Sequence, residues 1–194
     1  MNEFDNLRKQ IENFSAIPDS DWELLLPHLH IKTLRKNELF IAESKKANEV
    51  GFVISGMLRQ FYTKDGEEKT TYFFFENHFV CAYFSCITKK PSLITIEALS
   101  DVTYISFPYS ILESLYEQSM AWQKFGRRLA EYLGMGLEER MVSLLVQSPE
   151  ERYLSLLASN KQKIIERIPQ HYIANYLGIT AVSMSRIRNR VLKK

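Results

Sequence analysis

The chain has 194 residues, of which 45% are hydrophobic and 25% are charged, so it can build one large core or two small ones. The N-terminus lacks a basic segment followed by an apolar run, and no apolar run approaches the ~18 residues of a membrane-spanning helix. We therefore expect a cytoplasmic protein with no membrane partner. Cys81 and Cys86 are too few for a four-thiolate metal site, and we expect two reduced thiols, with a redox pair as the alternative.

The net charge of +2 is unevenly distributed along the chain. From residue 151 onward there are nine Lys or Arg against two Glu, which gives that end +7 and leaves −5 for residues 1–150. A basic end joined to an acidic remainder is typical of a nucleic-acid-binding domain attached to a partner domain. The charge pattern therefore favours a nucleic acid as a partner of the C-terminal part, and the helix pattern described below indicates double-stranded DNA.

The first hundred residues are expected to change from helix to strand. Apolar residues three and four apart predict a helix over residues 4–14, and a second short helix follows around Trp22. From about residue 30 the pattern alternates and is rich in β-branched and aromatic residues, which indicates an antiparallel barrel or roll. The expected strands cover residues 40–41, 50–54, 58–63, 70–75, 94–98 and 102–107.

Two glycine positions predict turns within this roll. Asp65-Gly66 lies between two expected strands, and it suits a type I′ hairpin because both central residues of that turn have positive φ. Gly56 is expected to mark a second turn or a bulge.

A long helix is expected over residues 120–147, after a shorter one at 108–119. At about 28 residues it would be about 40 Å long, more than the roll needs to cover its core. Its apolar stripe favours pairing with the same helix of a second copy, and packing wholly on its own domain is the alternative. The expected dimer interface consists of Trp122, Phe125, Leu129, Leu133, Leu137 and Met141.

The C-terminal part is expected to hold two short helices joined by a tight turn. Ser148 and Pro149 suit the cap and first position of a preceding helix, whose inner face is expected at Tyr153, Leu154 and Leu157. Gly178 ends the first of the two helices, and Thr180 is expected to cap the second. The helical spacing predicts an inner face of Ile173, Ala174 and Leu177 on the first helix and of Met184, Ile187 and Val191 on the second. The outer face of that second helix carries Ala181, Val182, Ser185, Arg186, Asn189 and Arg190. This pattern predicts a DNA-reading helix-turn-helix, with an ordinary helical hairpin as the alternative.

Several motifs together resemble one known family. They are Gly56-x-Leu58-Arg59 with Asp65-Gly66, Ser148-Pro149-Glu150-Glu151-Arg152-Tyr153, and Ile173-Ala174-x-x-Leu177-Gly178-Ile179-Thr180 followed by Ser185-Arg186-Ile187. In this order they resemble the Crp/Fnr family of bacterial transcription regulators. The resemblance implies an α+β protein with a cyclic nucleotide-binding-like β-roll at residues 1–119, a dimerisation helix at 120–147 and a winged helix-turn-helix at 148–194.

The resemblance also implies roles for individual residues. The second helix of each helix-turn-helix would enter the major groove, where Arg186 would read a base. Thr180, Ser183 and Gln170 would approach phosphates, with Asn189 and Arg190 on the same surface. RNA polymerase is then a candidate partner. Lys193 and Lys194 are further candidates for phosphate contacts.

The roll departs from the family members that bind a cyclic nucleotide. Those members use Gly-Glu followed by Arg-Ser or Arg-Thr, whereas this chain has no Gly between Gly66 and Gly126 and no Arg between Arg59 and Arg127. A cyclic phosphate would lose a paired charge. We therefore expect no response to cyclic AMP and no cofactor. An effector pocket for an unknown small molecule would use Lys89, Lys90 and Ser92, although a solvated loop is the plainer interpretation.

The sequence leaves two alternatives open, a metal-binding roll fused to the helix-turn-helix and a protein-interaction module. A cupin-like metal site would rest on His28-x-His30, with Glu38 and His78 as further ligands, and two partly exposed histidines are the simpler interpretation. The sequence contains no Walker, dinucleotide or Gly-x-Ser-x-Gly motif, so we expect no enzyme. A protein-interaction module that does not bind DNA is also conceivable, but it leaves the basic end without a role.

Overall fold

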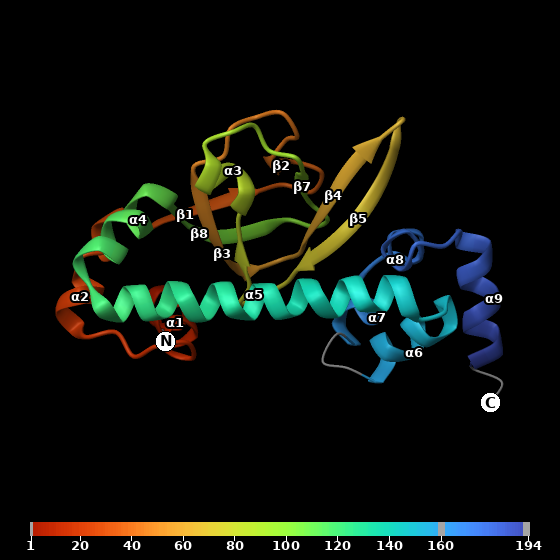
Figure 1. The fold of residues 1–194 in the computed structure, drawn as a ribbon. Helices are drawn as coiled ribbons and strands as arrows, with labels where there is room; N and C mark the ends of the chain where they lie inside the picture. The colour runs from red at the N-terminus through yellow and green to blue at the C-terminus, as the bar shows by residue number, and fades with distance from the viewer. Residues whose placement is uncertain (1, 159–161, 192–194) are drawn as a thin grey trace. The chain divides into compact units, whose positions relative to one another are not determined.

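The structure is a computed structural model that describes residues 2–158 and 162–191 (Figure 1). The helices are α1 (Glu3–Glu12), α2 (Asp19–Glu23), η1 (Leu26–His28), α3 (Tyr83–Thr88), α4 (Tyr109–Gln118), α5 (Met120–Val146), α6 (Pro149–Ala158), α7 (Gln162–Arg167), α8 (Gln170–Leu177) and α9 (Ala181–Val191). The strands are β1 (His30–Leu34), β2 (Leu39–Ile41), β3 (Glu49–Ser55), β4 (Leu58–Lys64), β5 (Glu67–Phe74), β6 (Phe79–Val80), β7 (Thr95–Ala98) and β8 (Val102–Pro108).

The described strands form two four-stranded sheets, ordered β1-β8-β3-β6 and β2-β7-β4-β5. In the first sheet β8 pairs antiparallel with both β1 and β3, so that Ser106 stands opposite His30 on one side and Gly51 on the other. In a roll, strands that are distant in the sequence pair with each other, whereas in a meander each strand pairs with the next one along the chain. The predicted antiparallel roll is confirmed.

Both predicted turns are present, and each has a backbone reason. Asp65 has φ 54° and Gly66 has φ 78°, as the type I′ hairpin between β4 and β5 requires. Gly56 has φ 93°, and a Cβ there would lie 2.3 Å from the carbonyl oxygen of Asp101. No other residue type fits at Gly56 without displacing the backbone of the facing loop.

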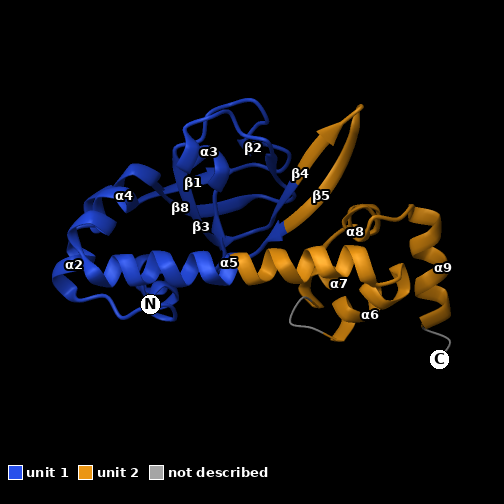
Figure 2. Cartoon of the chain, in the orientation of Figure 1, with its two compact units in different colours: residues 1–60, 73–133 blue, residues 61–72, 134–194 orange. Residues whose placement is uncertain are grey.

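Figure 2 shows that the chain divides into two compact units. The first contains residues 1–60 and 73–133, and the second contains residues 61–72 and 134–194. The boundary therefore lies within α5 and not at either of its ends. The tip of the β4–β5 hairpin belongs to the second unit, where the side-chain amide of Asn175 accepts from Thr70 N at 2.5 Å and donates to Glu68 O at 2.7 Å.

The core of the first unit joins its helices to the roll. Leu7 and Ile11 of α1, Leu112 of α4, and Trp122 and Phe125 of α5 are buried in one cluster with the strands. Phe125 contacts Phe14 edge to face at 5.9 Å and Trp122 at 5.6 Å. Aromatic side chains bury large apolar areas, and edge-to-face pairs at these distances stabilise a core further.

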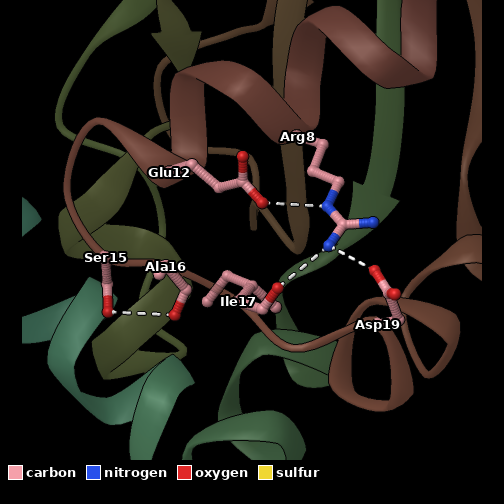
Figure 3. Close-up of polar contacts among 6 residues, drawn as sticks. All are labelled: Arg8, Glu12, Ser15, Ala16, Ile17 and Asp19. Atoms are coloured by element: carbon pink, nitrogen blue, oxygen red, sulfur yellow. Dashed lines mark hydrogen bonds and ion pairs between the residues drawn. The ribbon is translucent and has the colours of Figure 1, made fainter.

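Hydrogen bonds from Arg8 connect α1 to the start of α2 (Figure 3). Arg8 donates from Nε to Glu12 at 3.0 Å, and from Nη2 to Ile17 O at 3.0 Å and to Asp19 at 2.6 Å. Its guanidinium carbon also lies 5.7 Å from the ring centroid of Trp22. The hydrogen bond from Arg8 to Asp19 is the main reason why the pKa of Arg8 is raised.

Some elements differ from the sequence-based expectation. β1 and α3 were not predicted, since β1 has no buried position and α3 has only six residues and no side-chain cap. The inner face of α6 was expected at Tyr153, Leu154 and Leu157, but the buried residues are Arg152, Tyr153 and Leu156. The described parts of the C-terminal region, 149–158 and 162–191, hold helices and no strand, so no wing is seen there.

Candidate DNA interface

Helices α8 and α9 pack through small apolar faces. Ile173, Ala174 and Leu177 of α8 are buried, as are Met184 and Ile187 of α9. These are the residues that the helical spacing predicted for the inner faces, except that Val191 is only half-buried. The pairing leaves the opposite face of α9 open.

The turn between the two helices is built by Gly178. It has φ 71° and donates from its N–H to Asn175 O at 3.0 Å, while Ile179 donates to Ala174 O at 3.0 Å. This pair of bonds is a Schellman motif, which satisfies carbonyls that the end of α8 would otherwise leave unpaired. A glycine in this left-handed position therefore sets the direction in which the chain enters α9.

Thr180 caps α9 as predicted. Its Oγ1 accepts from the backbone N–H of Ser183 at 3.1 Å and donates to the Ser183 hydroxyl at 3.0 Å. The first turn of α9 also keeps N–H groups without helical acceptors, which makes it a suitable neighbour for a phosphate. Thr180 is exposed and Ser183 half-buried, and Gln170 is exposed at the first position of α8.

The outer face of α9 is exposed along its whole length. Ala181, Ser185, Arg186 and Asn189 are exposed, and the side chain of Val182 is 62% exposed. Within the described residues Arg186 forms no ion pair, whereas Arg190 pairs with Glu150 at 3.0 Å. The structure thus places the predicted base-reading arginine on an open surface and assigns Arg190 a partner within the protein. Lys193 and Lys194 lie outside the described residues.

The predicted cap of α6 is also present. Ser148 Oγ accepts from Glu151 N at 3.3 Å, and Ser148 N donates to the Glu151 carboxylate at 2.7 Å, which completes a capping box. The bond from the Ser148 backbone is the main cause that lowers the pKa of Glu151.

The predicted dimer stripe on α5 is divided between two environments. Trp122 is 0% exposed and Phe125 is 2% exposed, because both fill the core of their own chain, and Leu129 packs against that core. Trp122 and Phe125 therefore have no surface to offer a partner and are removed from the predicted interface. Beyond them α5 is apolar and open, at Tyr132, Leu133, Met135, Leu137, Met141, Val142, Leu144, Leu145 and Val146.

The residues of the candidate effector pocket are engaged within the chain. Lys89 bonds both carboxylate oxygens of Glu113, at 2.9 and 3.0 Å. Ser92 is buried, and its hydroxyl donates to Ile94 O at 2.8 Å and accepts from Ile94 N at 3.2 Å. Lys90 is exposed, and its carbonyl accepts from Ser85 Oγ at 2.6 Å. The Lys89 ammonium group and the Ser92 hydroxyl thus already have partners within the chain.

The cysteines and histidines form no metal cluster in the described part of the chain. His28 ends η1, whereas His30 starts β1, so the two imidazoles are not neighbours on one strand. Cys81 and Cys86 are free thiols with their sulfurs 3.4 Å apart. The hydrogen bond between them raises the pKa of Cys81 and lowers that of Cys86.

Among the described helices, none combines the length and the apolar character needed to cross a membrane.

Residues 31–119 match the family model described as the cyclic nucleotide-binding domain. The chain is similar in structure to FixK2 from Bradyrhizobium japonicum, with TM-score 0.71, 20% identity and 85% coverage of each chain. It carries the fold of the Crp/Fnr regulators. This bears out the predicted resemblance at the level of fold.

Other regulators with this Crp/Fnr fold match equally widely. A transcriptional regulator of the Crp/Fnr family from Eubacterium rectale has TM-score 0.70 and 20% identity, with 91% of this chain and 85% of that chain covered. The c-di-GMP responsive global regulator CLP from Xanthomonas campestris has TM-score 0.67 and 15% identity, with 91% and 92% covered. No curated protein sequence matches this chain.

Proposed function

We propose that the protein is a transcription regulator of the Crp/Fnr type that binds an inverted-repeat DNA operator as a homodimer. The observation that carries the proposal is the open face of α9, with Arg186 and Asn189 exposed on a helix whose opposite face is buried against α8. An exposed helix of this kind fits the major groove, where an arginine fork can bond O6 and N7 of a guanine. We propose no catalytic role.

The charge of the chain supports DNA rather than a protein as the partner of this surface. Residues 151–194 carry a net charge of +7, and a protein-interaction module would give this charge no function. Lys and Arg side chains that neutralise phosphates release counterions, so the affinity falls as salt rises.

The second part of the proposal concerns the partner subunit and the effector. The apolar side chains of α5 after Tyr132 form an exposed surface that a second α5 would bury.

Cyclic AMP is not proposed as the effector, because the roll lacks the glycine and arginine that close on a cyclic phosphate and Ser92 is already hydrogen-bonded.

Filter binding of the full chain to random-sequence duplex DNA tests the proposal. We expect binding whose logarithmic affinity falls linearly with the logarithm of salt concentration. If the protein retained no duplex DNA on the filter even at low salt, that result would contradict the regulator function and would favour a protein-interaction module.

A further inference from the structure

Two arginines from different helices meet at the carboxyl end of α8. Arg140 of α5 donates to the carbonyl of Tyr176, and its guanidinium carbon lies 3.8 Å from the centroid of the Tyr176 ring. Arg152 of α6 donates to Leu177 O at 3.1 Å from Nε and at 2.9 Å from Nη2. Its Nη1 donates to Gln147 O at 2.5 Å.

The positive charge of this pair is not neutralised by an ion pair, although the exposed carboxylate of Glu139 lines the same cavity. Within residues 2–158 and 162–191 neither arginine forms an ion pair, and their protein acceptors are backbone carbonyls. The end of a helix offers about half a negative charge against two full positive charges. Burial, followed by the neighbouring Arg152, lowers the pKa of Arg140, as expected where like charges share a partly dry site.

The two arginines line one cavity of about 170 Å³, together with Ser143, Gln147, Ser155 and the exposed Glu139. All of these residues belong to the second compact unit. The cavity is smaller than the roughly 300 Å³ at which drug-sized pockets begin, so its size suits a small oxyanion with one or two waters better than a nucleotide.

We propose that this cavity binds a small oxyanion, namely phosphate, either free or as the end group of a small phosphomonoester. The guanidinium N–H groups that the backbone carbonyls leave unused supply charge-assisted donors, and the Ser155 hydroxyl and the Gln147 amide nitrogen supply further donors. The Ser143 hydroxyl already donates to Gln147 Oε1 at 2.8 Å. A bound phosphate would be held by α5 and α6 at the end of α8, so it would stiffen the attachment of the helix-turn-helix to the long helix.

The alternative is that the arginines only cap α8. If the arginines only cap α8, loss of Arg140 should destabilise the second unit. In that case phosphate should not change the thermal stability of the protein. Phosphate dependence therefore separates the two roles. The test needs no DNA, so its outcome is independent of the proposed DNA binding.

The experiment measures the thermal midpoint of the full chain while sodium phosphate replaces sodium chloride at constant ionic strength. Wild type should show a saturable rise, because a ligand that binds only the folded state stabilises it. Isothermal calorimetry should give a matching 1:1 stoichiometry. Inorganic phosphate and glycerol 3-phosphate are titrated in parallel, and the tighter of the two identifies the source of the phosphate group.

Two variants and one control make the result specific. Arg140→Gln should weaken phosphate at least tenfold, and Ser155→Glu should do the same while leaving both arginines in place as caps. Arg127→Gln removes an exposed arginine of the same helix, which pairs with Glu131 at 2.5 Å, and should respond as wild type does. No saturable effect in wild type, or equal responses in wild type, Arg140→Gln and Ser155→Glu, would overturn the proposal.

Discussion

At the scale of the residue, two arginines on α9 differ in their contacts within the protein. Arg186 is exposed without an ion pair in the described part of the chain, whereas Arg190 is 3.0 Å from Glu150. A side chain without a protein partner can place both arms of its guanidinium on one base. A side chain that already pairs with a carboxylate has to give up that contact first. We therefore propose base reading for Arg186 and contact with the DNA backbone for Arg190.

The first prediction concerns Arg186→Ala. Loss of the bidentate contact should cost about 1–3 kcal/mol per half-site and should flatten the preference at one base pair. Equilibrium binding at fixed salt would be measured on operators that differ by single bases. Arg190→Ala is the matched control, expected to weaken every operator alike. If Arg186→Ala also lost affinity equally on all operators, Arg186 would be a phosphate contact.

Local chemistry made several residues predictable. The cap at Thr180, the capping box at Ser148 and the positive φ of Gly178 each follow from neighbours within a few positions. Buried charges did not follow in this way. Arg59 is 2% exposed and bonds Glu97 at 2.7 and 2.9 Å, across 38 positions of sequence. A charged residue is buried only where a partner meets it, and that partner is set by the tertiary fold.

At the scale of the element, the second prediction concerns the start of α9. Thr180→Ala removes the acceptor for the Ser183 N–H and should lower the free energy of unfolding by about 0.5–2 kcal/mol. Urea denaturation followed by circular dichroism measures this. Ser185→Ala, on the exposed face of the same helix, should change the unfolding free energy by less than about 0.5 kcal/mol. Equal effects of the two variants would show that the cap contributes nothing.

The third prediction concerns the exposed half of α5. Leu137 is 71% exposed, so a charge there should leave the monomer folded but should prevent a second α5 from packing on it. Sedimentation without DNA should give a dimer for wild type and a monomer for Leu137→Asp. Lys124→Glu, on an exposed position of the buried half of α5, should remain dimeric. A monomeric wild type at micromolar concentration would refute the predicted interface.

The same helix shows what periodicity leaves undecided. Within this chain the apolar stripe of α5 is buried only at Trp122 and Phe125. The spacing is identical for Trp122, which fills its own core, and for Leu137, which does not. Helical period reports which residues share a face, and it does not report what covers that face. Short elements such as α3 carry too few residues for any period, which is why the sequence did not reveal it.

At the scale of the whole molecule, the fold and the ligand are separate questions. The match of residues 31–119 to the cyclic nucleotide-binding domain describes a fold, while binding depends on individual side chains within it. We predict no binding of cyclic AMP or cyclic GMP at physiological concentrations, because a buried phosphate without a paired charge is costly. Calorimetric titration of each nucleotide measures this. Micromolar affinity for either nucleotide would show that Lys89 or Lys90 substitutes for the arginine.

The central claim is that a dimer of this chain reads DNA through two copies of α9. Two recognition helices related by two-fold symmetry should lie in successive major grooves, with half-site centres about 34 Å apart, or roughly one helical turn. Selection of bound duplexes from a random DNA pool by the full chain, followed by sequencing, tests this most directly. The account predicts enrichment of an inverted repeat with that spacing. A pool that remains as random as the input, or that yields only single unpaired half-sites, would contradict it.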